Sequence, residues 1–170
     1  MKRLLVVIDM QKDFIDGALG SAEAQAIVEP VLAKMESYRE AGDEIVFTMD
    51  THGEDYLETQ EGQRLPVVHC VKDTDGWQLE ERIGAFVGVR FKKKTFGSRK
   101  LAKYIKQGLY SQVELVGLCT DICVISNAIV IKAFVPEMKI VVDSSCCAGV
   151  TPQSHQTALE AMKMCQIEVI

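Results

Sequence analysis

The chain has 170 residues and a formal net charge of −5 at pH 7, with 48% apolar and 25% charged residues. That balance is typical of a globular protein, and the length suits a single domain over residues 1–170. The negative charge argues against a nucleic-acid-binding surface, which needs concentrated Lys and Arg, and no apolar run approaches the ~20 residues of a membrane helix.

The start of the chain and its cysteines bear on where the protein works. Met1–Arg3 resembles the start of a secretory signal, but the apolar run that follows, Leu4–Ile8, is too short and ends at Asp9. Without an export signal, we expect the six cysteines to be free thiols in a reducing cytoplasm. We expect a cytoplasmic homo-oligomer that acts on a small molecule, with neither nucleic acid nor membrane as a partner.

Short apolar strands alternate with helices along the chain. Leu4–Ile8 is a continuous apolar run, as in a strand buried on both faces. A helix is predicted from about Pro30, a residue tolerated in a first turn, to a cap at Gly42, and a second strand at Glu44–Met49. The stretch Thr51–Gly84 is predicted to be irregular, and a loop of that length in a compact domain is usually functional.

The second half of the chain continues this alternation. Apolar runs predict strands at 85–91, 113–116, 139–142 and 166–170, and periodic segments with capping residues predict helices over 98–108, 122–134 and 151–164. Strands alternating with helices imply the α/β class, with a three-layer α/β/α arrangement around a central parallel sheet of about six strands.

In such a sheet the ligand lies beyond the carboxyl ends of the strands. Polar and thiol groups follow the expected strands at that edge, namely Asp9, Asp50 and His52, Lys92–Lys94, Cys119–Cys123 and Ser144–Cys147. A catalytic rim is therefore predicted there. The basic run Arg90–Lys94 could equally be a solvated strand end.

Cys123 is the candidate nucleophile. It falls in the first turn of a helix that follows a strand and a tight turn. The free N–H groups and partial positive charge of a helix N-terminus favour a thiolate, so its pKa is expected below the usual ~8.5. The same N–H groups can hold an oxyanion. A buried structural cysteine is the alternative.

Two further groups of residues complete the candidate site. Asp9, at the end of a buried strand, needs a partner or a role, and one lysine of Lys92–Lys94 could pair with it. Asp50, His52 and His69 could form a metal site with open positions, although they could also be unrelated loop residues. The third histidine, His155, is expected at the surface.

Two motifs resemble the isochorismatase-like cysteine hydrolases, and the nicotinamidase branch among them. They are Val7-Ile8-Asp9-Met10-Gln11-Lys12-Asp13-Phe14 and Gly117-Leu118-Cys119-Thr120-Asp121-Ile122-Cys123-Val124. The resemblance covers the whole chain in order and implies that family's three-layer fold. The chain is shorter than most nicotinamidases, and its insert between His52 and His69 lacks their usual aromatic residues.

The resemblance implies an Asp-Lys-Cys triad. It maps onto Asp9, Lys94 and Cys123, with Lys94 chosen because an aromatic residue follows it two positions later. It also implies an oxyanion hole formed by the backbone N–H groups of Cys119 and Cys123, after a cis Leu118–Cys119 peptide bond.

The resemblance also implies a divalent metal, for which we expect Zn²⁺, held by Asp50, His52 and His69 with Glu61 as an added ligand. Phe14 and Trp77 are expected to line the substrate pocket. The expected reaction is hydrolysis of a small amide, nicotinamide or a relative, through a thioester on Cys123. The alternatives are a metal-dependent hydrolase of another small C–N or ester substrate, a thiol redox protein, and a non-catalytic binding module.

Overall fold

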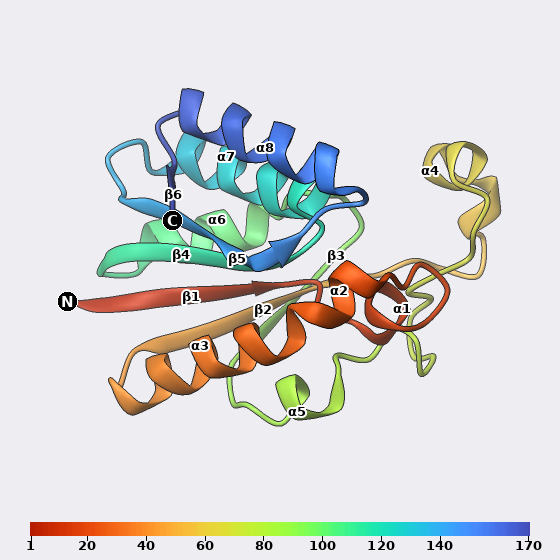
Figure 1. Ribbon diagram of the computed structural model, residues 1–170, viewed down its shortest axis with the longest axis horizontal. Helices are drawn as coiled ribbons and strands as arrows, with labels where there is room; N and C mark the ends of the chain where they lie inside the picture. The colour runs from red at the N-terminus through yellow and green to blue at the C-terminus, as the bar shows by residue number, and fades with distance from the viewer.

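The computed structural model describes residues 1–170, and its centre is a parallel sheet of six strands in the order β3-β2-β1-β4-β5-β6. Helices pack on both faces of this sheet (Figure 1). The predicted fold class is confirmed. The strands are β1 (Lys2–Ile8), β2 (Glu44–Asp50), β3 (Val89–Lys93), β4 (Tyr110–Leu118), β5 (Ile140–Ala148) and β6 (Glu168–Val169).

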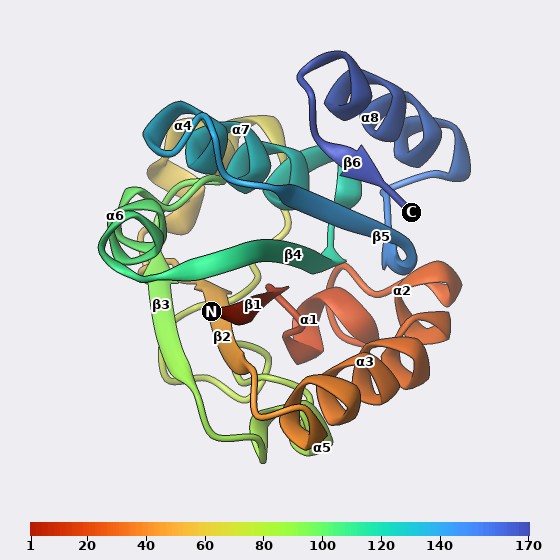
Figure 2. The same ribbon diagram turned by 90° about the vertical axis from the view of Figure 1, so that its left-hand side faces the viewer.

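The helices divide between the two faces of the sheet. One layer contains α1, α2, α3 and α5, and the other contains α6, α7 and α8 (Figures 1 and 2). No helix is both long enough and apolar enough to cross a bilayer. The helical segments are α1 (Lys12–Ile15), α2 (Ala22–Ala26), α3 (Val28–Glu40), η1 (Tyr56–Glu58), α4 (Gln60–Arg64), α5 (Glu81–Gly84), α6 (Arg99–Gln107), η2 (Thr120–Val124), α7 (Ile125–Phe134) and α8 (Pro152–Met164).

Strand β1 forms the centre of both cores. Its residues Leu4–Ile8 are fully buried, and because side chains alternate along a strand, they divide between the two faces. Leu5 and Val7 pack in the α3 layer, while Leu4, Val6 and Ile8 pack in the layer of α6, α7 and α8. The apolar run has no polar side because neither face of this strand meets water.

The strand order reverses between β1 and β4, which lie side by side. Ligands bind beyond the carboxyl ends of the strands at such a reversal. Gly117 of β4 has φ of 117°, and a Cβ there would lie 2.1 Å from the carbonyl oxygen of Ile8. A glycine is therefore needed for the ends of β1 and β4 to approach closely.

Among the strand boundaries that differ from the sequence-based expectation, two affect residues near the carboxyl edge of the sheet. Strand β3 begins at Val89 rather than at 85, because the preceding apolar residues leave the sheet and Val87 is almost fully exposed. Strand β5 continues to Ala148, so Ser144–Cys147 lie within the strand rather than beyond it. The segment predicted to be irregular, Thr51–Gly84, contains only the short helical turns η1, α4 and α5.

Candidate active site

Cys123 lies directly beyond the carboxyl end of β4. The chain leaves this strand through a cis Leu118–Cys119 peptide bond, as expected, and enters the wide turn η2, which continues into α7. The carbonyl oxygen of Cys119 accepts hydrogen bonds from the N–H groups of Ile122 (3.1 Å) and Val124 (3.0 Å). The N–H group of Cys119 donates no hydrogen bond within the protein, so it is free to bind a developing oxyanion.

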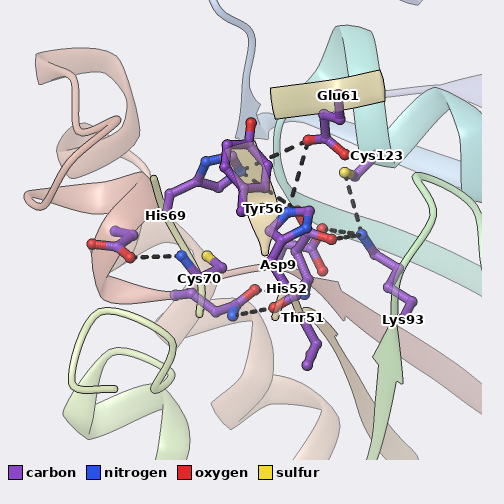
Figure 3. A network of polar contacts seen from close by, with 12 residues as sticks. Asp9, Thr51, His52, Tyr56, Glu61, His69, Cys70, Lys93 and Cys123 are labelled. Carbon is purple, nitrogen blue, oxygen red and sulfur yellow. Dashed lines mark hydrogen bonds and ion pairs between the residues drawn. The ribbon is translucent and has the colours of Figure 1, made fainter. Parts of the chain in front are cut away.

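Asp9 and Lys93 complete a chain of contacts to this thiol (Figure 3). The carboxylate of Asp9 is fully buried and accepts a hydrogen bond from the Thr48 hydroxyl at 2.7 Å. The ammonium of Lys93 lies 2.6 Å from the second oxygen of Asp9 and donates to Cys123 Sγ at 3.4 Å. Asp9 also has φ of 48°, an uncommon backbone conformation for a non-glycine residue that is frequent at functional sites.

The lysine assigned from the motif spacing, Lys94, is wrong, and its neighbour Lys93 takes the place. Lys93 is the last residue of β3 and pairs in register with Asp50. Its side chain is 2% exposed, whereas Lys92 and Lys94 are exposed. Side chains alternate along a strand, so only one lysine of the three can point to the thiol.

The expectation that the Cys123 pKa is lowered is also wrong. Burial raises the pKa of the thiol and the charge of Asp9 raises it further, while Lys93 acts to lower it. Burial raises the pKa of Asp9 too, against the opposing charge of Lys93. The raised pKa of Cys123 favours the thiol over the thiolate, and the raised pKa of Asp9 makes its carboxylate form a stronger proton acceptor than a solvated aspartate.

The four expected metal ligands lie together beside Asp9 and Lys93. They come from β2, the segment after it, α4 and the segment before Cys70. They are Asp50, His52, Glu61 and His69, and their nearest ligand atoms all lie within 4.8 Å of one another. His52 Nε2 is 3.1 Å from Asp50 Oδ2, and the Nε2 atoms of His52 and His69 are each 3.8 Å from Glu61 Oε1. Figure 3 labels three of the four residues, His52, Glu61 and His69.

The donor set fits a divalent ion such as zinc. Two imidazole nitrogens and two carboxylates are common zinc ligands, and bonds of ~2.0–2.1 Å in a tetrahedral site put ligand atoms about 3.3–3.5 Å apart. His69 Nδ1–H donates to the carbonyl of Val67 at 2.7 Å, which leaves Nε2 free to bind metal. Burial acts to raise the pKa of Asp50, but His52 and Lys93 outweigh it and keep this carboxyl ionised.

Hydrogen bonds from the first motif position these ligands. The side chain of Gln11 donates to the carbonyl of Asp50 at 2.8 Å and accepts from its N–H at 2.7 Å. Asp13 accepts the N–H of Cys70 at 2.7 Å and so fixes the backbone next to His69. The motif thus contains Asp9 and also positions Asp50 and the backbone next to His69, two of the candidate metal ligands.

A cavity of about 560 Å³ opens onto Cys123 and the candidate metal ligands Asp50, Glu61 and His69. Phe14 lines it as expected, and its ring lies 5.4 Å from that of His69. Trp77 does not line it, so that assignment is wrong: the indole is buried and donates to the Thr51 hydroxyl at 2.9 Å. The lining residues are Phe14, Ala18, Leu19, Gly20, Ser21, Ala24, Asp50, Glu61, Leu65, His69, Phe96, Leu118, Cys119, Ile122, Cys123, Gly149 and Val150.

Comparison with known proteins identifies the family of this chain. The family model described as the isochorismatase domain matches residues 3–170. The chain belongs to the isochorismatase domain family. Among curated members, it is 26% identical over 189 residues to the nicotinamidase/pyrazinamidase of Mycobacterium tuberculosis, covering 99% of this chain and 98% of that protein.

Solved structures of this family extend the comparison. The pyrazinamidase of Pyrococcus horikoshii in complex with zinc is similar at 26% identity and a TM-score of 0.84, with 100% of this chain and 99% of that chain covered. The pyrazinamidase/nicotinamidase of Streptococcus mutans is similar at 26% identity and a TM-score of 0.87, with coverage of 99% and 100%.

Several site residues were missed from the sequence. Asn127 is fully buried in α7 and donates to the carbonyls of Phe96 and Cys123, at 3.1 and 2.8 Å, so it ties a cavity wall to the nucleophile turn. The signal for it in the sequence is an amide side chain in a helix that is apolar on most sides. His155 was expected at the surface, yet it is only partly exposed and its Nδ1 lies 2.7 Å from the hydroxyl of Thr120.

Proposed function

We propose that this protein hydrolyses a small amide, nicotinamide or a related heteroaromatic amide, through a thioester on Cys123. The observation that carries the proposal is the position of the Lys93 ammonium between the Asp9 carboxylate and the Cys123 sulfur. A nucleophile, a proton acceptor and a fixed cation within one buried site suit acyl transfer. The family relatives named as nicotinamidases support an amide-hydrolysing enzyme.

The first half of the reaction forms the thioester. Asp9 takes the proton of the Cys123 thiol as the sulfur attacks the amide carbonyl, and Lys93 stabilises the charge that passes between them. The carbonyl oxygen becomes an oxyanion close to the N–H groups of Cys119 and Cys123. The unused N–H of Cys119 supports this role, because it needs no rearrangement to accept the new charge.

The second half releases the products. Asp9 gives its proton to the amide nitrogen, and the C–N bond breaks. Ammonia leaves, and the acyl group stays bound to the Cys123 sulfur as a thioester. Asp9 then takes a proton from a water molecule, whose oxygen attacks the thioester carbonyl. The C–S bond breaks, the carboxylic acid leaves, and Cys123 regains its proton.

We propose that the neighbouring cluster holds Zn²⁺ and orients the substrate. Asp50, His52, Glu61 and His69 would hold the ion, and three of them, Asp50, Glu61 and His69, also line the cavity. When bound, the ion supplies a Lewis-acidic site for a ring nitrogen or a water molecule. That favours heteroaromatic amides, with the ring of Phe14 beside His69 as one wall.

The same cluster favours a second candidate, metal-dependent hydrolysis without a covalent intermediate. The ligand residues open onto the cavity that contains the thiol, so a metal-activated water could reach the same carbonyl. In that reaction Cys123 would be dispensable and His52 would not.

One experiment separates the two mechanisms. The zinc-loaded protein is mixed with nicotinamide and the release of ammonia is measured. Samples quenched in acid are then digested, and the masses of the peptides are determined by mass spectrometry. We expect a nicotinoyl adduct on the Cys123 peptide and loss of ammonia release in Cys123→Ala. Cys146→Ala, at a buried cysteine outside the cavity, is the matched control and should retain turnover. Turnover that survives in Cys123→Ala and disappears in His52→Ala would establish the metal-dependent reaction instead.

A further inference from the structure

The active-site cavity extends well beyond the metal cluster. At one end its walls are Glu61 of α4 and Leu65, and at the other they are Ala24 of α2 and Val150 after β5. Both views place α4 and α2 apart at the carboxyl edge of the sheet (Figures 1 and 2). Cys123 follows the central strand β4, so the cavity has a metal end and an α2 end with the nucleophile reachable from both.

The size of the cavity exceeds the needs of a single-ring amide. Its volume of about 560 Å³ is in the range that encloses most of a drug-sized ligand. A pyridine carboxamide that spans from Cys123 to the metal ligands would occupy only the metal end. The α2 end would then hold water against apolar walls, which is unfavourable.

The walls of the α2 end define what could fill it. Ala18, Leu19, Ala24 and Val150 are apolar, and none of the cavity-lining residues from this end is charged. Ser21 is the polar exception, and its hydroxyl already accepts the N–H of Ala24 as the cap of α2. An uncharged, mainly apolar group suits this surface, and a carboxylate or a phosphate does not.

Resting on the proposed function, we propose that the preferred substrate is an amide carrying an apolar extension that reaches the α2 end. The extension can be attached at two places. On the amide nitrogen, the C–N bond that breaks releases a primary amine, which takes its proton from Asp9. On the ring, ammonia leaves and the extended acid follows after hydrolysis of the thioester.

The test compares nicotinamide, N-butylnicotinamide and 5-butylnicotinamide, with the acid product measured by mass spectrometry. Each methylene buried in an apolar site is worth several-fold in binding, so at least one butyl compound should exceed nicotinamide about tenfold in kcat/KM. Which compound does so identifies the point of attachment. If kcat/KM is lower for both butyl compounds than for nicotinamide, this inference is overturned and the proposed function is left intact. Absence of turnover of all three, with no acyl group on Cys123, overturns both.

A pair of variants ties the preference to the α2 end. Ala18 lies at the cavity and is exposed, so Ala18→Leu fills the space without burdening the core. It should lower the ratio of butyl to unsubstituted kcat/KM at least about tenfold. Ala26→Leu, an exposed position of α2 outside the cavity, is the matched control and should leave the ratio unchanged. An equal change in both variants contradicts the inference.

A second test does not depend on turnover. It compares the rates at which iodoacetamide and N-butyl-iodoacetamide label Cys123. The rate of the butyl reagent, corrected for its rate with glutathione, should exceed that of the parent reagent about tenfold, and Ala18→Leu should remove the difference. Equal corrected rates in the unmodified protein overturn the inference.

Discussion

Two lysines in this protein, Lys93 and Lys34, each form ion pairs with two carboxylates, at different positions along the strands of the sheet. At the carboxyl edge, Lys93 lies 2.6 Å from Asp9 and 3.5 Å from Asp50. Between α3 and the middle of the sheet, Lys34 lies 2.7 Å from Glu114 and 2.8 Å from Asp143. The two clusters have the same charges and similar distances, and their surroundings differ.

The Lys34 cluster is closed by hydrogen bonds. The Tyr38 hydroxyl donates to Glu114 at 2.6 Å, and Ser145 donates to Asp143 from both its hydroxyl and its N–H. Glu114 and Asp143 lie within regular strands, and none of the three charged residues lines the active-site cavity. Each charge therefore has a protein partner, and the cluster lies outside the active-site cavity.

The Lys93 cluster lies beside a nucleophile and a cavity. Lys93 contacts the Cys123 sulfur, and the cavity reaches that sulfur and Asp50. Buried charges and shifted pKa values occur in both clusters, so they do not by themselves mark an active site. The distinguishing features are the position beyond the strand ends and the thiol within reach of the proton acceptor.

The largest expected effect comes from removing the same charge in each cluster. Asp9→Asn keeps the shape of the base and removes its ability to take a proton, so kcat should fall at least about a thousandfold. Glu114→Gln makes the equivalent change in the Lys34 cluster and should retain the kcat of the unmodified protein. Ammonia release at 25 °C measures both, and a similar loss in both variants would remove the distinction between the clusters.

The next effect tests the choice between adjacent lysines. Lys93→Met should lower kcat/KM about a hundredfold to a thousandfold, because the charge between Asp9 and Cys123 is lost. Lys94→Met changes an exposed residue of the same type and should be neutral. A large loss in Lys94→Met with little loss in Lys93→Met would restore the assignment made from motif spacing.

Stability should respond in the Lys34 cluster. Glu114→Ala leaves a partly buried ammonium with one partner fewer and should cost about 3 kcal/mol of unfolding free energy, lowering Tm by roughly 6–12 °C. The double variant Lys34→Met/Glu114→Leu should recover part of this loss, since it removes both charges together. Urea unfolding measures the free energies, and strictly additive losses would show that the pair is uncoupled.

The metal ligands give a smaller effect on the Lys93 side. His52→Ala should raise KM for nicotinamide about tenfold or more and lower kcat less, because substrate orientation is weakened while the triad remains. Zinc content after loading should fall from about one equivalent to well below one. Equal zinc content in His52→Ala and the unmodified protein would contradict the metal site.

The smallest effect is a pH dependence in the Lys34 cluster. Burial acts to raise the pKa of Asp143, but Lys34 and Ser145 outweigh it and lower the pKa below its unfolded value of ~3.9. This ion pair therefore stabilises the protein above about pH 4 and is lost as pH falls through the lowered pKa. Asp143→Asn should be less stable by about 1 kcal/mol at pH 7 and by less at pH 3, as measured by urea unfolding. A difference that grows on acidification would reverse the sign.

The sequence predicted the site better where an apolar run marks the end of a strand than where the choice of residue depends on how two strands pair. Asp9, Asp50 and Cys123 could be placed because strand ends are readable from apolar runs. Lys93 could not, since the choice among three lysines depends on the register between β2 and β3, and the start of β3 was misplaced. Trp77 was misassigned because the sequence does not distinguish an aromatic side chain packed in the core from one that lines a pocket.

The close approach at Gly117 keeps the carboxyl ends of β1 and β4 together. Asp9, the proposed proton acceptor, follows β1, Cys123, the proposed nucleophile, follows β4, and these two strands are hydrogen-bonded neighbours. Neighbouring strands in a sheet are spaced about 4.8 Å apart. The separation between the two residues that exchange the proton in the proposed reaction therefore depends on the spacing of two paired strands and not on a flexible loop. A side chain at position 117 would push β1 and β4 apart at Ile8, the residue before Asp9.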